Sequence, residues 1–385
     1  MLLGHGLRRL YLDPGGTLAC VYARDAKIAG ATNTAVEWAL QDARFRPASD
    51  LGELATNQFY PAGLTRSPGI RRVLPNHFLD LDRWETRRHW LHRAPQRASG
   101  SEAVLLAERI GGRIQHQVSA VCRALPTYLS LTAGRDSRML LACSRHVVDR
   151  ITFITFAYSG QETVADVSIS KALSRRLGLR STILPVADVD DDIKKRYLAR
   201  IGYAGHWGKS CDFYYAAARN LDPARAFLPG FGGEVGRAFY WKKLPNAADI
   251  PAPEQLLSVM NVSASATAVS AMRRWLDGIQ PPNAHSLLDQ LYLEQRLGCW
   301  AAPHMYGFAP FAVTLTAFCH REVFGAMARL PVEYVRKQRL TDDVVSRYWP
   351  ETASFPYQRN TGIRGVAESI RSRGRRTLKR LVGRP

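Results

Sequence analysis

The chain has 385 residues, of which 46% are hydrophobic, so it is long enough to bury a sizeable core and to form two or three domains. Its 53 Lys and Arg residues against 33 Asp and Glu residues give a formal charge of +20, which favours polyanions as partners. No stretch approaches the roughly 20 apolar residues of a membrane-spanning helix, and residues 1–12 lack the apolar run of a signal peptide. We therefore expect a cytoplasmic protein without a transmembrane segment.

Cysteine and histidine spacing excludes several metal and redox functions. No C-x-x-C pair and no H-E-x-x-H motif is present. We expect the cysteines to be reduced and mostly buried, and the histidines to be core or surface residues. The cysteines are Cys20, Cys122, Cys143, Cys211, Cys299 and Cys319, and the histidines that we considered are His77, His89, His92, His304 and His320.

The first domain that we predict is a small β-rich module, residues 1–95. Short apolar segments interrupted by Pro, Gly and Asn are typical of such a module. Residues 8–13 and 20–24 predict strands, residues 35–41 predict a helix, and residues 69–82 predict two strands that pair as a hairpin. A polar connector at residues 91–101 separates this module from the rest of the chain.

The second domain, residues 100–355, begins with an amphipathic helix at residues 102–122. An apolar strand at 125–131 then passes through a turn of small residues, 132–137, into a helix. Such a loop points backbone N–H groups and the positive end of a helix dipole at one place, which suits a phosphate chain. The loop is not a Walker A loop, because no lysine follows its glycine.

A parallel α/β sheet is predicted by the next elements. Residues 151–158 form a β-branched and aromatic run, residues 164–177 predict a helix, and Gly178 is its expected cap. Because ligands bind at the carboxyl ends of such strands, the loops after 125–131 and after the short strand 226–228 should lie on one rim. Asp166 is more simply explained as a first-turn acid favoured by the helix dipole.

Amphipathic helices are predicted for residues 251–299, and a basic tail follows at residues 356–385. Residues 359–385 hold nine basic residues against one acid, Glu368, which gives a local charge of +8 and leaves +12 for the rest of the chain. A terminal charge run of this kind is usually solvated, so no specific nucleic acid is expected as a partner.

The loop Thr132-Ala133-Gly134-Arg135-Asp136-Ser137 resembles the pyrophosphate-binding loop S-G-G-x-D-S of the asparagine synthetase family. A second segment, residues 229–240, aligns without gaps on that family's S-G-E-G-x-D-E-x-x-G-G-Y loop.

In the second segment, Gly230, Gly232 and Tyr240 match the family loop, and Glu234 stands at its aspartate. The segment 69–82 is similar to the strand pair G-I-x-x-L-P-P-G-H-x-L of the family's glutaminase half. The resemblance covers about residues 69–350.

This resemblance implies an ATP-pyrophosphatase fold in which a carboxylate is adenylated and then attacked by an amine. Backbone N–H groups of residues 133–137 and the hydroxyls of Thr132 and Ser137 would hold the phosphates of ATP. Gly230, Gly232 and Gly233 would line the nucleotide. Asp136 and Glu234 would bind Mg²⁺.

A family lysine that contacts pyrophosphate falls at Gln338, so its neighbour Lys337 or Arg339 is the expected substitute.

Three departures from the family limit what the resemblance implies. Leu2 stands where the family has its glutaminase cysteine, so glutamine hydrolysis is not expected and residues 1–95 correspond to a truncated glutaminase-like module. Phe231 replaces the glutamate of G-E-G. Residues 306–313 keep Pro310 and Phe311 of E-V-R-x-P-F-x-D but lose its three charged positions, which belong to the acceptor side.

The expected activity is therefore an ATP-dependent, amide-forming ligase that converts aspartate to asparagine or performs a related amidation. Ammonia or another amine would be the donor, supplied from solution or by a separate glutaminase or other partner protein. A catalytically impaired or partner-activated relative, a macrolactam-type cyclase and an RNA-modifying pyrophosphatase remain as alternatives. The last would show salt-sensitive RNA binding.

Overall fold

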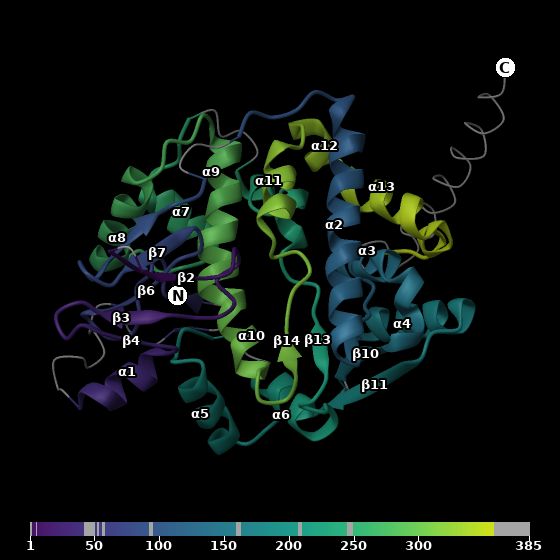
Figure 1. The fold of residues 1–385 in the computed structure, drawn as a ribbon, viewed down its shortest axis with the longest axis horizontal. Helices are drawn as coiled ribbons and strands as arrows, with labels where there is room; N and C mark the ends of the chain where they lie inside the picture. The colour runs from purple at the N-terminus through teal and green to yellow at the C-terminus, as the bar shows by residue number, and fades with distance from the viewer. Residues whose placement is uncertain are drawn as a thin grey trace.

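The computed structural model describes residues 2–4, 6–41, 51, 54–55, 58–91, 95–158, 163–206, 210–244 and 249–357. It is an α/β structure with a parallel sheet and a smaller antiparallel part (Figure 1). The expected basic tail lies outside the described residues from position 358 onward. No helix among these residues is both long and apolar enough to cross a membrane.

The parallel sheet has five strands in the order β11, β10, β9, β13 and β14, and every neighbouring pair is parallel. The strands are β9 (Thr127–Ser130), β10 (Ile151–Tyr158), β11 (Ser181–Val186), β13 (Ala226–Leu228) and β14 (Val313–Thr314). Strands β10 and β11 lie on one side of β9, and the later strands β13 and β14 lie on its other side. The order therefore reverses between β9 and β13, which is where open α/β sheets bind ligands.

Helices cover both faces of this sheet, which explains the continuous apolar runs in its strands. Leu129 and Phe153 pack in the main core with α2 (Glu102–Ala124), α3 (Arg135–Cys143) and α4 (Val164–Leu177). Ile154 and Phe227 pack on the other face against α6 (Ser210–Asn220) and α10 (Ala302–Phe308). The predicted strand 151–158, the helix 164–177 and the left-handed cap at Gly178 are confirmed.

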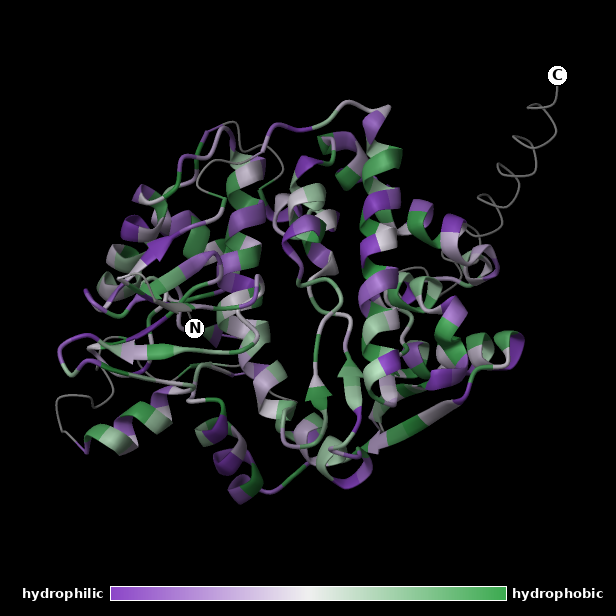
Figure 2. Cartoon of the chain, in the orientation of Figure 1, coloured by the Kyte–Doolittle hydropathy of each residue, from purple (hydrophilic) through white to green (hydrophobic). Residues whose placement is uncertain are grey.

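Hydrophobic and hydrophilic residues alternate around the turns of α2 (Figure 2), as its sequence predicts. The helical region 251–299 is also confirmed. Between residues 100 and 355 the structure also has the helices α5 (Asp191–Arg200), α7 (Pro253–Met260), α8 (Ala266–Asp277), α9 (Ala284–Leu291), α11 (Arg321–Arg329), α12 (Val332–Arg336) and α13 (Arg339–Tyr348) and the π-helix η6 (Tyr292–Ala301). Short 3₁₀ turns are η2 (Arg145–Arg150), η4 (Gly233–Arg237), η5 (Trp241–Lys243) and η7 (Pro350–Ser354).

The N-terminal part contains two antiparallel sheets, in the orders β1-β2-β7-β8 and β4-β3-β6. Leu10 and Leu79 of the first sheet share a hydrophobic cluster with Tyr22 and Ala29 of the second, so the two sheets pack face to face. Helix α1 (Asn33–Leu40) covers the outer face of the second sheet through Val36. The strands are β1 (Leu2–Gly4), β2 (Leu7–Tyr11), β3 (Val21–Ala23), β4 (Ile28–Gly30), β6 (Ile70–Arg72), β7 (His77–Asp80) and β8 (Glu85–Arg88).

The hairpin expected within residues 69–82 is wrong, although both of its strands form. Strand β6 pairs with β3 and strand β7 pairs with β2 and β8, so the two lie in different sheets. Burial explains this choice, because Ile70 packs under α1 whereas Leu79 packs between the sheets. A further two-stranded sheet pairs β5 (Gln58–Phe59) with β12 (Gly205–His206) and so joins the two parts of the chain.

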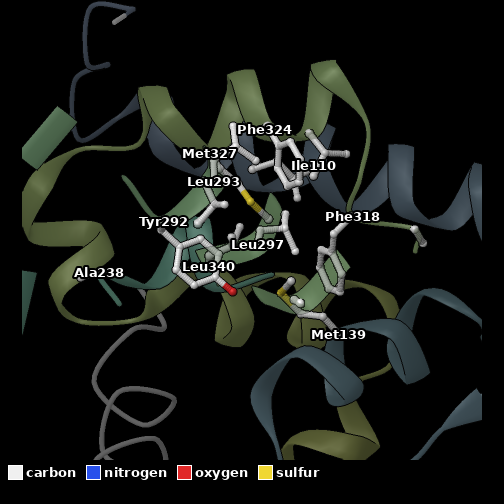
Figure 3. Packing of buried hydrophobic residues seen from close by; sticks show 14 of the residues in the cluster. Ile110, Met139, Ala238, Tyr292, Leu293, Leu297, Phe318, Phe324, Met327 and Leu340 are labelled. Atoms are coloured by element: carbon white, nitrogen blue, oxygen red, sulfur yellow. The ribbon is translucent and has the colours of Figure 1, made fainter. Parts of the chain in front are cut away.

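The largest hydrophobic cluster joins η6, α11, α2, α3 and α13. Figure 3 shows Tyr292, Leu293 and Leu297 of η6 packed beside Phe324 and Met327 of α11. Other labelled side chains that reach this cluster are Ile110 of α2, Met139 of α3, Leu340 of α13 and Phe318, which lies between β14 and α11.

Candidate active site

The loop between β9 and α3 has the geometry of an anion site. Helix α3 begins at Arg135, with Gly134 as its N-cap in an extended conformation. Within the described part of the chain, the N–H groups of Arg135, Asp136 and Ser137 donate to no acceptor, as in the open first turn of a helix. The hydroxyls of Thr132 and Ser137 lie 2.8 Å apart beside this turn.

Two of the five expected backbone donors are already engaged. The Ala133 N–H donates to Asp166 Oδ1 at 2.7 Å, and the Gly134 N–H donates to Thr132 Oγ1 at 3.0 Å. Only the N–H groups of residues 135–137 are therefore open to a phosphate. Asp166 has a further role beyond the dipole effect that we assigned to it: it fixes the loop to α4.

Asp136 is a buried carboxylate in the first turn of α3. Its Oδ2 accepts a hydrogen bond from Arg237 Nη2 at 2.5 Å, whereas its Oδ1 is buried with no hydrogen-bond partner in the described chain. Burial is the main reason that the pKa of Asp136 is raised to about 7; Arg237 opposes this rise and the nearby Glu234 adds to it. An orphaned, buried carboxylate oxygen is a place where a cation or a proton would be stabilised.

Glu234 lies on the turn η4, which follows β13. Its Oε2 accepts hydrogen bonds from the Tyr292 hydroxyl at 2.7 Å and from the Gly232 N–H at 3.2 Å. Its Oε1 lies 3.7 Å from Arg237 Nη2, so this one guanidinium is shared by Glu234 and Asp136. The structure thus brings the two predicted carboxylates together.

Arg237 and Tyr292 were not identified from the sequence. Arg237 is 101 positions from Asp136 and Tyr292 is 58 positions from Glu234. The only local signal was the spacing of Glu234 and Arg237, which places both on one turn of a helix.

The glycines of the second loop are explained by close packing. A Cβ on Gly233 would lie 2.3 Å from Asp136 Oδ1, so a side chain there would displace the carboxylate. Gly232 has a φ of +100°, which side chains rarely adopt. Gly230 is less constrained, since its Cβ would lie 3.4 Å from the Ser137 nitrogen. Gly230 and Gly233 therefore lie against the first loop, whereas Gly232 packs against Phe318 and Phe324. Of these three predicted glycines, Gly230 alone lines the pocket.

A pocket of about 750 Å³ opens at these two loops, within the usual size range of small-molecule sites. It contains Lys337, whose Nζ lies 3.8 Å from Glu333 Oε2 and whose side chain is largely exposed. Arg339 instead lies over the ring of Tyr334, 5.6 Å from its centroid. Of the two expected substitutes for the family lysine, Lys337 is the one at the pocket.

A divalent ion fits this donor set only with the help of a ligand. Among the described residues, no group of three or more His, Cys, Asp or Glu side chains could hold a metal. Asp136 and Glu234 supply two carboxylates, and Mg²⁺ is commonly bound by one or two carboxylates together with phosphate oxygens and water. The two carboxylates would therefore fit Mg²⁺ only with further oxygen ligands, and Arg237, which now lies near both, would have to move aside.

His304 is a core residue, as expected for a histidine outside any motif, and it also lines the pocket. It is buried, and its Nδ1 lies 2.6 Å from the Tyr197 hydroxyl. Burial, helped by Arg296, lowers the pKa of His304 to about 3, so this side chain is neutral.

A scan against models of protein families found no match for the chain, and a comparison with curated proteins found none either.

Proposed function

We propose that the chain is an ATP-dependent ligase that adenylates a carboxylic acid and transfers the acyl group to an amine, releasing AMP and pyrophosphate. The observation that carries this proposal is the meeting of an open α3 N-terminus with Asp136 and Glu234 where the strand order reverses. The sequence resemblance to asparagine synthetases rests on the same two loops. A cytoplasmic location, where ATP is supplied, is part of the proposal.

In the first step, a carboxylate oxygen bonds to the α-phosphorus of ATP while the bridging bond to the β-phosphate breaks and pyrophosphate leaves. In the second, the amine nitrogen bonds to the acyl carbon, the bond to AMP breaks, and the amine loses a proton. Both steps depend on holding negative charge in place more than on acid–base catalysis.

The chain's own groups divide this work. The N–H groups of residues 135–137 bind phosphate oxygens, and Lys337 neutralises the departing pyrophosphate. Asp136 and Glu234 would hold Mg²⁺, which would neutralise negative charge on the phosphates. Arg237, once released from the carboxylates, pairs with a phosphate oxygen. The amine is ammonia or another amine from solution or from a partner.

Magnesium-dependent exchange of labelled pyrophosphate into ATP tests the proposal across a panel of carboxylic acids. Asp136→Asn removes one carboxylate charge with little change of shape, and we expect it to abolish exchange. Asp212→Asn is the matched control, because Asp212 is equally buried and accepts from the Val189 N–H but lies outside the pocket. Exchange that survives Asp136→Asn would contradict the assigned site.

One observation favours a second candidate, a catalytically impaired or partner-activated relative. Arg237 already neutralises both carboxylates, so a cation has to compete with it. Measurable ATP binding without exchange for any acid would favour this alternative. Recovery of exchange in Arg237→Gln would then identify the arginine as the obstacle.

A further inference from the structure

A second cavity, of about 720 Å³, lies between α2 and α11. These two helices pack against each other (Figure 1). No described residue lines both this cavity and the pocket at the parallel sheet. The volume is within the usual range of small-molecule sites. We call this cavity the arginine groove, because Arg109, Arg113 and Arg329 line it.

The groove follows one face of each helix. On α2, Leu106, Arg109 and Arg113 are spaced by three and four residues, which places them on one side of the helix. This stretch of α2 spans about 10 Å, because a helix rises about 1.5 Å per residue. Arg113 pairs with Glu322 at the start of α11, and Arg329 lies at the end of the same helix. Basic groups therefore lie along the length of the groove.

Positive charge in the groove exceeds negative charge. Arg113 has its acidic partner on α11, but the side chains of Arg109 and Arg329 form no hydrogen bond or ion pair with any described residue. Glu102 lies near enough to Arg329 to interact with its charge, but this carboxylate accepts its hydrogen bonds from Ser99. Since like charges spaced four residues apart on a helix repel one another, an anion in the groove would be stabilised by two guanidinium groups that have no other partner.

Apolar groups line the groove beside these arginines. Trp90 is half-buried and lies over α11, where a Cβ on Gly325 would be 3.7 Å from Trp90 Cζ2. Leu106 and Ala326 are buried and line the groove from its two helices. The indole ring also lies 5.9 Å from the guanidinium carbon of Arg321. An aromatic ring next to guanidinium groups suits a ligand that has both an apolar and an anionic part.

We propose that the arginine groove binds a small soluble molecule that carries one anionic head, a carboxylate or a phosphate, on an apolar body. The head would lie between Arg109 and Arg329, because guanidinium groups bind carboxylates and phosphates through paired hydrogen bonds. The apolar body would lie against Trp90 and Leu106. This site is independent of the proposed ligase activity, because the two cavities share no described residue.

Calorimetry with four probes tests whether both parts of such a ligand are needed. Phenyl phosphate and 3-phenylpropanoate have a head and a body, inorganic phosphate has only a head, and 3-phenylpropanol has only a body. We expect at least one of the first two probes to bind at least tenfold more tightly than both of the others. No saturable binding of either two-part probe at millimolar concentration would overturn the proposal. Equally tight binding of a one-part probe would overturn it too.

Two arginine variants locate the anionic head. Arg109→Gln and Arg329→Gln should each weaken binding of the tighter two-part probe at least fivefold. Both should unfold at the same urea concentration as the unaltered protein, because neither guanidinium holds another side chain in place. Arg123→Gln should change nothing, since Arg123 is an exposed arginine of α2 outside both cavities. Unchanged binding in a variant that lacks both groove arginines would place the probe elsewhere and overturn the proposal.

A side chain at Gly325 tests where the apolar body lies. The position accepts one, because its Cβ would make only ordinary contact with Trp90. Gly325→Leu should fill the groove and weaken the tighter two-part probe at least fivefold. Gly278→Leu is the matched control, because Gly278 is an exposed glycine outside both cavities whose Cβ would also make only ordinary contacts. Equal binding in the two leucine variants would contradict the assigned position.

A nucleic acid is the competing explanation for the arginines of the groove. We expect oligouridylate RNA to bind the unaltered protein and the variants Arg109→Gln and Arg329→Gln equally, because the +20 charge of the chain extends well beyond these residues. RNA binding that is lost in both variants, without binding of either two-part probe, would assign these arginines to a polyanion. That result would overturn the small-molecule site.

Discussion

The hydroxyl of Tyr292 fixes the orientation of Glu234 from a buried position on η6. Tyr292→Phe removes that hydroxyl and keeps the ring against Phe239. We expect kcat for pyrophosphate exchange to fall by about 10- to 150-fold, because a hydrogen bond to a charged group contributes about 1.5–3 kcal/mol. The KM for the acid should change much less, since Tyr292 positions a carboxylate and does not line the pocket.

Tyr334→Phe is the control for this prediction. The Tyr334 hydroxyl donates to Asp343 Oδ2 at 2.6 Å, which is the same kind of bond at a position outside the pocket. Its loss should leave exchange unchanged. Equal loss of kcat in both variants would mean that general destabilisation, and not the orientation of Glu234, is responsible.

His304 should make the protein sensitive to acid. Its pKa lies near 3 in the folded chain, against 6.5 ordinarily, so between these values the unfolded chain binds the proton that the folded chain excludes. The contribution of neutral His304 to the free energy of unfolding is therefore fully present above pH 6.5. It falls as the pH drops toward 3, by about 1.4 kcal/mol per pH unit. His304→Gln, which stays neutral and can still accept from Tyr197, should show a shallower fall in urea unfolding measured from pH 7 to pH 4. Parallel curves for the two proteins would contradict this.

Some residues of the candidate site could be predicted from the sequence and others could not. Asp136, Glu234 and the glycines were identifiable because each belongs to a short motif along the chain. Arg237 and Tyr292 were not, because their partners are set by how η4 and η6 pack against α3. Asp166 lies in the first turn of α4 as expected, but its contact with the Ala133 N–H was not expected, since that contact depends on the pairing of β9 with β10.

At the scale of elements, η6 links the N-terminal sheets to the site. Arg88 of β8 forms a bidentate ion pair with Glu294, one bond of which measures 2.8 Å, and Asn76 and the Trp275 indole also donate to this carboxylate. Glu294 is fully buried and lies two residues after Tyr292. Short π-helical segments often occur at functional sites. Here the π-helix η6 contains both Tyr292 and Glu294.

Removing Arg88 should therefore destabilise the protein strongly. Arg88→Met leaves Glu294 charged and buried without its main partner, which costs about 3–5 kcal/mol. Arg87→Met is the matched control on the same strand, because Arg87 pairs with Glu85 at the surface, where a pair contributes about 0–1 kcal/mol. Urea unfolding of the two variants measures the difference. Similar midpoints would show that the buried pair does not hold β8 to η6.

The helices and strands were predicted best where their own residues determine where they begin and end. The β-branched run of β10 and the glycine cap of α4 are local features, and both elements begin and end where expected. Strands β6 and β7 were also expected, but their partners were not. Pairing depends on which face Ile70 and Leu79 bury, and that is decided by α1 and by the opposite sheet.

At the scale of the whole molecule, the hydrophobic core is continuous between the N-terminal part and the part that holds the parallel sheet. Phe59, Leu64 and Leu74 from the first 95 residues belong to the same cluster as Leu129 and Leu297. The antiparallel pairing of β5 with β12 adds backbone hydrogen bonds between the two parts. Neither part buries its apolar surface fully without the other.

We therefore expect the chain to unfold in a single cooperative transition. Leu74→Ala removes a side chain from the shared core, and Leu79→Ala removes one from the cluster between the two N-terminal sheets. Each should lower the free energy of unfolding by about 2–5 kcal/mol. Because the parts unfold together, both variants should shift the same urea transition, followed by tryptophan fluorescence and by circular dichroism. An early transition that appears only in Leu79→Ala would instead mean that the N-terminal sheets unfold as an independent unit, and the link from Arg88 through η6 to Glu234 could then be broken without unfolding the parallel sheet.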